Sequence, residues 1–224
     1  MKIQEFNTVK QLNNDLANQF VVWIKQAIAE YSQARILLSG GSTPISFYNS
    51  LAKKDLDWTK ISIGLVDERY VDQRSDFSNE TLIYQSLIHN NLRHVKVAPM
   101  VQFIDDPKKN LAAINEAYAP FFERTDIALI GMGDDGHTAS LFPDDRASQH
   151  LLESDEKGIF YTSAPSHPKD RITCSPSILK DANHCVLLMH GLKKQKVLQK
   201  SEAHNLPIAR FINCPNFQLY YSKS

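Results

Sequence analysis

The sequence predicts an α/β fold of the Rossmann-like, three-layer type, in which helices flank a mostly parallel central sheet. Two observations lead to this fold class. Short apolar segments of strand length alternate along the chain with longer segments of helical periodicity. Glycine or polar residues directly follow several of the apolar segments, as at the carboxyl ends of parallel strands. No repeat, low-complexity tract or linker interrupts the 224 residues, so we expect one domain over residues 1–224.

The first expected elements follow from periodicity and turn chemistry. Apolar residues recur at helical spacing over residues 12–31, which predicts a long amphipathic helix. Residues 35–39 and 61–66 are short apolar runs and predict two buried strands. Between them, Thr43 and Pro44 predict a helix with Thr43 as its N-cap and Pro44 at its first helical position.

The same patterns continue through the rest of the chain. Helices are expected after Ser78 and after Asp106, each of which can cap a helix. Further strands are expected at residues 126–130, 158–162 and 184–189, the last two each followed by a possible helix, and an edge strand at residues 217–221.

The composition argues against several classes of protein. The 25 basic and 25 acidic residues balance, so nothing global attracts nucleic acid or an anionic membrane, and we expect neither as a partner. The three cysteines, Cys174, Cys185 and Cys214, lie in separate segments, which is typical of a reduced protein without disulfides or a thiolate metal site. The chain starts without an apolar segment and contains no apolar run approaching about 18 residues. We therefore expect a cytoplasmic protein.

Three polar clusters fall just beyond the ends of predicted strands, where ligands bind in parallel α/β sheets. They are residues 39–43, 67–69 and 131–137. Their shared position is the first indication of a functional site.

Residues 131–136 match the G-x-G-x-x-G pattern of a dinucleotide-binding turn. The surrounding sequence opposes that function. Asp134 and Asp135 would face the pyrophosphate, and no acid follows the strand at residues 158–162 to bind a ribose. We interpret these residues as an active-site turn and keep dinucleotide binding as the alternative.

The cluster at residues 39–43 is a candidate phosphate-binding loop. Gly40 and Gly41 allow the backbone to approach an anion closely, and the N–H groups at the following helix start can bind a phosphate. The alternative is an ordinary strand-to-helix turn with Thr43 as a structural cap.

His137 is a candidate general base. Asp135 is close enough in sequence to orient the imidazole or to stabilise its charge, and histidine titrates near neutrality. The alternative is an isolated surface or core histidine. The eight histidines include no H-E-x-x-H and no tight cluster, so no metal is expected. Neither Ser39 nor Ser140 lies in a G-x-S-x-G motif, which argues against a serine nucleophile.

Taken together, these motifs resemble the 6-phosphogluconolactonase family, within the glucosamine-6-phosphate isomerase/6-phosphogluconolactonase superfamily. The matching segments, in family order, are residues 38–44, residues 67–69 with Ser78 and Asn79, residues 131–143, residues 171–173 and residues 191–194. The resemblance therefore spans most of the chain.

The resemblance implies hydrolysis of 6-phospho-D-glucono-1,5-lactone to 6-phospho-D-gluconate in the oxidative pentose phosphate pathway. No metal or organic cofactor is expected, because a lactone is already a reactive ester. His137 would be the general base beside Asp135, and Asp67 would orient water or sugar hydroxyls. The residues expected to bind the substrate are Gly40, Gly41, Ser42, Thr43, Arg69, Arg171 and Lys194. Among these, Arg171 and Lys194 would clamp the phosphate, whereas Arg69 and loop amides are candidate oxyanion donors.

Two other functions remain open. One is a glucosamine-6-phosphate deaminase/isomerase, whose motif carries a glutamate shortly after the histidine, where this chain has residues 140–143 without any acid. The other is a sugar-phosphate-sensing module without catalysis, although no DNA-binding segment or basic patch is visible. In each case the partner is a small sugar phosphate, and the protein is expected to be a monomer or a small homo-oligomer.

Overall fold

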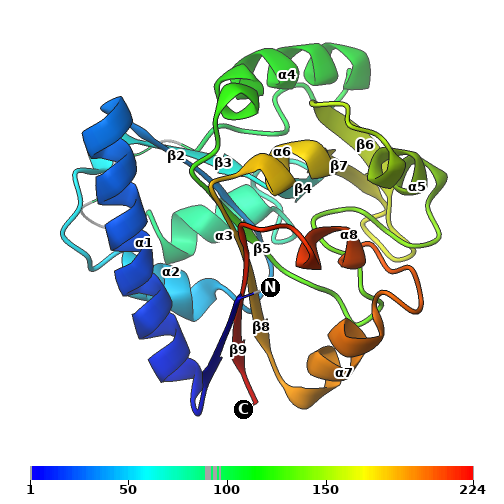
Figure 1. Ribbon diagram of the computed structural model, residues 1–224. Helices are drawn as coiled ribbons and strands as arrows, with labels where there is room; N and C mark the ends of the chain where they lie inside the picture. The colour runs from blue at the N-terminus through cyan, green and yellow to red at the C-terminus, as the bar shows by residue number, and fades with distance from the viewer. Residues whose placement is uncertain (1, 89–91, 93–94, 96, 224) are drawn as a thin grey trace.

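The computed structural model describes residues 2–88, 92, 95 and 97–223, and its centre is a six-stranded sheet (Figure 1). The strand order is β1-β9-β8-β5-β2-β3, and every neighbouring pair is parallel. The strands are β1 (Lys2–Phe6), β2 (Ala34–Leu38), β3 (Ile61–Leu65), β5 (Ile127–Ile130), β8 (His184–His190) and β9 (Phe217–Ser222). The predicted α/β fold class with a parallel sheet is confirmed.

Helices cover both faces of this sheet. In Figure 1, α1 and α2 lie on the left of the sheet and α7 and α8 on the right. The helices are α1 (Val9–Tyr31), α2 (Ile45–Leu51), α3 (Asn79–Ser86), α4 (Pro107–Glu123), α5 (Arg146–Glu153), α6 (Pro176–Asp181), α7 (Leu192–Lys200) and α8 (Ala209–Ile212), with a 3₁₀ turn at Trp58–Lys60. The result is a three-layer arrangement, because the helices on each side bury their apolar faces against the sheet between them.

The first helix illustrates how the pattern determines the packing. Leu12, Leu16, Phe20 and Ile24 recur every four residues, and all four are fully buried. The Thr8 hydroxyl accepts a hydrogen bond from a first-turn amide and caps the helix. The expected caps at Ser78 and Asp106 are also confirmed, because each side chain accepts a bond from an amide three residues on.

The start of α2 differs from the prediction. The helix begins at Ile45 with Pro44 at the capping position, and Thr43 makes no capping hydrogen bond. Pro44 precedes the helix although its own backbone angles are helical, so the boundary differs from the prediction by only one residue. The Thr43 amide and hydroxyl therefore belong to the loop and not to the helix.

A second, three-stranded antiparallel sheet was not predicted. It has the order β4-β7-β6 and consists of β4 (Asp67–Arg69), β6 (Ile159–Ser163) and β7 (Asp170–Cys174). The expected helix after residues 158–162 is wrong, because the chain reverses there and returns as β7. Pro165 and Pro168 fall in that reversal, where proline favours a turn over a helix.

The carboxyl-terminal strand is present but is not an edge strand. β9 lies between β1 and β8, because residues 2–6 add a parallel strand outside it. Four of the five β1 residues are exposed, and the sequence of the strand does not alternate between apolar and polar residues. This strand could not be read from a local pattern.

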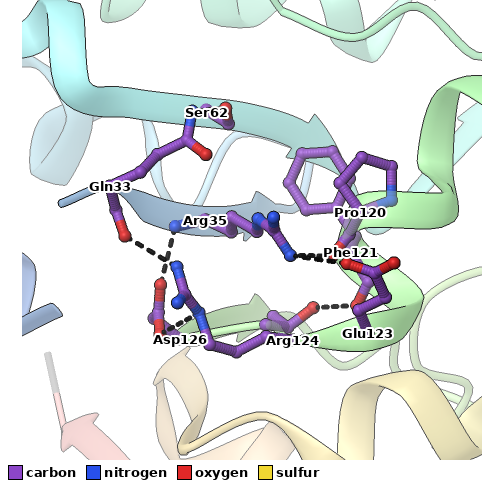
Figure 2. Close-up of polar contacts among 9 residues, drawn as sticks. Gln33, Arg35, Ser62, Pro120, Phe121, Glu123, Arg124 and Asp126 are labelled. Atoms are coloured by element: carbon purple, nitrogen blue, oxygen red, sulfur yellow. Dashed lines mark hydrogen bonds and ion pairs between the residues drawn. The ribbon is translucent and has the colours of Figure 1, made fainter. Parts of the chain in front are cut away.

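A buried ion pair holds the amino ends of β2 and β5 together (Figure 2). Asp126 is 2% exposed, accepts a 2.7 Å hydrogen bond from the Arg35 amide and forms a 3.1 Å ion pair with Arg124. Arg124 also donates to the Gln33 carbonyl at 2.7 Å. Because these groups lie at the amino ends, they are remote from the loops that follow the strands, and their role is structural.

The order of the strands determines where a ligand can bind. From β2 the chain adds β3 on one side, whereas β5 pairs with the other side of β2. The loops that follow β2 and β5 therefore diverge at a topological switch point, which leaves a crevice between them. In the described part of the chain, no helix combines the length and apolar character needed to cross a membrane.

Candidate active site

A cavity of about 240 Å³ lies at the carboxyl ends of β2, β5 and β8. It is lined by every residue that the sequence assigned to substrate binding, together with Asp67 and His137. These predicted lining residues are Gly40, Gly41, Ser42, Thr43, Asp67, Arg69, His137, Arg171 and Lys194. The one remaining predicted residue, Asp135, contacts the His137 ring and lines an adjoining cavity of about 470 Å³. The structure thus brings all ten residues together.

The pair of His137 and Asp135 has the geometry of an oriented base. Nδ1 of His137 lies 2.6 Å from Asp135 Oδ1, and the His137 amide donates to the same oxygen at 3.1 Å. Burial acts to raise the pKa of Asp135, but the bonds and charge of His137 outweigh it, so the pKa lies below its ordinary value. Because an ionised carboxylate only accepts hydrogen bonds, Nδ1 of a neutral His137 carries the proton and Nε2 is left free to accept one.

The glycines of the G-x-G-x-x-G segment serve this histidine. A Cβ on Gly133 would lie 2.2 Å from Cε1 of the His137 ring, so only glycine leaves room for the imidazole. Gly136 has a φ of +81°, which favours glycine, and its α-carbon packs against Leu206. Both glycines are therefore explained by the loop that carries His137.

Asp67 is held in the cavity by Ser140, which the sequence analysis considered only as a nucleophile and set aside. Ser140 is fully buried, and its hydroxyl donates a 2.6 Å hydrogen bond to Asp67 Oδ2. The Ser140 carbonyl accepts a bond from Thr162, and its amide donates to Thr173. The Asp67 carboxylate from β4 is thus tied to the loop that carries His137.

Three cations line the cavity without an acidic partner. Within the described residues, Arg69, Arg171 and Lys194 form no ion pair. Arg171 is only 8% exposed, and burial together with nearby Arg69 lowers its pKa. Burial also lowers the pKa of Lys194. Because an unpaired buried cation is costly, this cluster favours an anionic ligand.

Arg69 has a second unusual feature. Its Nη1 donates to the Phe77 carbonyl at 2.7 Å, whereas its Nε is buried without a hydrogen-bond partner. A ligand oxygen in the cavity could accept from the guanidinium, and this would relieve the cost of the unpaired donor.

The helix α7 is linked by an exposed ion pair to the loop that carries His137. Lys193 Nζ lies 2.5 Å from Asp134 Oδ2. Asp134 therefore turns away from the cavity toward α7, and it leaves the neighbouring Lys194 to line the cavity.

Sequence reasoning missed several lining residues. Ser39, Asn79, Met132, Ala139 and Leu188 also border the cavity. Asn79 belonged to a quoted motif but received no role. Met132, Ala139 and Leu188 are apolar, so their residue types gave no chemical signal. Ser39 was considered by itself only as a nucleophile.

Comparisons with known proteins agree with this geometry. Residues 7–220 match the family model for glucosamine-6-phosphate isomerases/6-phosphogluconolactonase. A 6-phosphogluconolactonase of Helicobacter pylori is 31% identical, with 98% of this chain and 97% of that protein covered. One of Rhizobium meliloti is 33% identical, with 88% and 86% covered. The crystal structure of a 6-phosphogluconolactonase from Shewanella baltica superposes with a TM-score of 0.91 at 27% identity, covering 99% of this chain and 97% of the other. The chain therefore belongs to the glucosamine-6-phosphate isomerase/6-phosphogluconolactonase family.

Proposed function

We propose that this protein hydrolyses 6-phospho-D-glucono-1,5-lactone to 6-phospho-D-gluconate, as in the oxidative pentose phosphate pathway. One observation carries the proposal: the cavity contains arginine and lysine side chains that form no ion pair within the part of the chain that the structure describes, and it also contains His137, whose ring is oriented by Asp135. Arg171 and Lys194 line this cavity and could bind a phosphate, and His137, whose ring contacts Asp135, lines the same cavity. The names of the 6-phosphogluconolactonase relatives support the same reaction.

Substrate binding begins at the phosphate. The dianion would accept hydrogen bonds from the loop amides of residues 40–43 and from the side chains of Arg171 and Lys194. The α2 helix has seven residues, so we assign most of the attraction to the loop amides and the two cations and little to a helix dipole. Holding one end of the substrate orients the lactone carbonyl toward His137 and turns an encounter into an oriented reaction.

The chemical step needs only a proton carrier and a donor for developing negative charge. Nε2 of His137 takes a proton from a water molecule, whose oxygen attacks C1 of the lactone. The resulting tetrahedral intermediate carries negative charge on the former carbonyl oxygen, and Arg69 or loop amides donate to it. Collapse breaks the bond between C1 and the ring oxygen, which receives the proton from His137. The product is the open-chain acid, and His137 returns to its neutral form.

Asp67 would accept hydrogen bonds from substrate hydroxyls or from the attacking water. Its bond with Ser140 engages one of the two carboxylate oxygens, which leaves acceptor capacity for a ligand. In this scheme Asp67 acts by orientation, whereas His137 acts on the proton.

The direct test is hydrolysis of the phosphorylated lactone by the purified protein at slightly acidic pH, where spontaneous hydrolysis is slow. We expect rapid turnover of the phosphorylated lactone and much slower turnover of glucono-1,5-lactone. Release of ammonia from glucosamine 6-phosphate, without lactone hydrolysis, would replace this function by that of the deaminases. Binding of 6-phosphogluconate without turnover of the lactone would indicate a sensing module. We also propose a cytoplasmic location, which the three free cysteines support.

A further inference from the structure

Asn79 belongs to the cavity but has no role in the reaction proposed above. It is the first residue of α3, is 2% exposed and lines the cavity beside Gly40 and Asp67. Its Nδ2 donates a 2.8 Å hydrogen bond to the Asp67 carbonyl. Its Oδ1 is buried and has no hydrogen-bond partner. A buried amide with one half unpaired calls for a structural reason.

The reason lies in the phosphate loop. A Cβ built on Gly40 would lie 1.8 Å from Asn79 Oδ1 and 2.1 Å from its Cγ, and the three nearest heavy atoms all belong to Asn79. The side-chain amide therefore rests directly against the Gly40 backbone. The neighbouring Gly41 differs, because it has a φ of +86° and open space around its α-carbon. Gly41 is required by its backbone conformation, whereas Gly40 is required by Asn79.

Asn79 cannot easily move away from this contact. Its backbone N–H donates to Glu68 Oε1 at 2.7 Å, and the same carboxylate accepts from the Glu80 backbone N–H and from the Ser78 hydroxyl. Glu68 is itself 2% exposed, so it anchors the start of α3 to β4. Reversing the side-chain amide of Asn79 would place its Oδ1 against the Asp67 carbonyl oxygen, and two acceptors cannot bond to each other. The orientation of the Asn79 side-chain amide is therefore fixed.

We propose that Asn79 is a positioning residue for phosphate recognition, and this rests on the proposed function. Its side chain is the spacer between the phosphate loop and β4, which carries Asp67 and Arg69. It thereby sets the separation between the groups that bind the phosphate and those that contact the lactone end. Binding of a ligand with a phosphate at one end and a ring carbonyl at the other depends on that separation, whereas binding of a lactone without a phosphate does not.

The first test is the Asn79→Ala variant. Removing the spacer lets the loop shift, so the KM for the phosphorylated lactone should rise roughly tenfold, the change expected for loss of one buried hydrogen bond. The KM for glucono-1,5-lactone should rise much less. Affinity for inorganic phosphate and for 6-phosphogluconate, measured by calorimetry, should fall in parallel. Asn115→Ala is the matched control, because Asn115 also holds backbone groups of another element but lies outside the cavity. It should leave the ratio of the two KM values at its wild-type value.

The second test is a double-variant cycle. Gly40→Ala places a methyl group where the Asn79 amide lies, so phosphate affinity should fall further than in Asn79→Ala. Combining the two changes removes the clash, and the double variant should bind phosphate more tightly than Gly40→Ala alone. Additive losses in the cycle, or wild-type phosphate affinity in Asn79→Ala, would overturn the role of Asn79.

The two proposals fail in different ways. A wild-type protein that does not hydrolyse the phosphorylated lactone refutes the proposed function, while calorimetry with inorganic phosphate still tests Asn79. A wild-type protein that does hydrolyse it, together with an Asn79→Ala variant whose two KM values rise equally, refutes only the role of Asn79.

Discussion

The hydroxyl of Ser140 donates a 2.6 Å hydrogen bond to the carboxylate of Asp67, across a separation of 73 residues. This bond joins β4 to the loop that carries His137, so these two parts of the candidate site cannot shift independently.

Ser140→Ala should lower kcat/KM for the phosphorylated lactone by roughly tenfold, because one hydrogen bond to a charged group is lost and Asp67 is no longer fixed. The Ser140 backbone bonds with Thr162 and Thr173 remain, so the fold should persist. Steady-state kinetics and a thermal melt together measure this. Ser177→Ala, another buried serine hydroxyl outside the cavity, is the control and should retain full activity. Unchanged kinetics in Ser140→Ala would mean that Asp67 needs no such support.

His137→Ala and His137→Asn should remove most lactonase activity while the protein stays folded. Loss of a general base typically lowers the rate by about 10²–10⁴-fold. The measurement is initial rate against an enzyme-free blank, with circular dichroism as the check on folding. A folded variant with near wild-type turnover would remove His137 from the mechanism.

Arg171→Ala and Lys194→Ala should mainly weaken recognition of the phosphate. Each change deletes a charge-assisted contact worth roughly 1.5–3 kcal/mol. The comparison that decides is between the phosphorylated lactone and glucono-1,5-lactone. An equal loss of activity on both substrates would show that these side chains do not bind the phosphate.

The purified protein should bind neither NAD nor NADP, because the imidazole of His137 already occupies the face of Gly133. It should instead be stabilised by 6-phosphogluconate, and a ligand concentration of about 100 Kd should raise the free energy of unfolding by roughly 2.7 kcal/mol. Calorimetric titration and thermal melts measure the two effects. Micromolar binding of NADP that is abolished by Gly133→Ala would restore the dinucleotide alternative.

Glu80→Gln should stabilise the protein above neutral pH and have no such effect near pH 4. Glu80 is 8% exposed, and burial, with nearby Glu68, raises its pKa to about 7. The folded state thus binds this proton more tightly than the unfolded chain, so stability falls as pH rises from about 4.5 to 7. Removing the carboxylate should raise the free energy of unfolding by up to about 3 kcal/mol at pH 8.

Urea unfolding at pH 4.5 and at pH 8 measures the effect of Glu80→Gln. The control is Glu116→Gln, an exposed glutamate on α4, which should change stability little at either pH. An equal gain at both pH values would show that the carboxylate charge is not the cause.

Much of the site follows from the sequence because its parts are local. Asp135 and His137 are two residues apart, so their contact depends only on the turn that the glycines permit. Residues 39–43 and residues 131–137 each follow a strand whose apolar run is visible, and parallel strands place their carboxyl ends at one edge of the sheet. The periodicity of residues 12–31 likewise fixed the first helix, because a buried helical face needs apolar residues every three or four positions.

Only the tertiary structure decided the contacts between distant segments. The addition of β1 outside β9 and the bond from Ser140 to Asp67 depend on pairing and burial, for which the local pattern carries no signal. The same holds for Gly40 and Asn79, which lie 39 positions apart by number and meet because Glu68 anchors α3 to β4. The sequence by itself determined which of the predicted residues gather at the candidate site, since turn geometry and strand ends are local properties. Their separation across the cavity was decided by packing, since it is set by side chains that meet only in the folded chain.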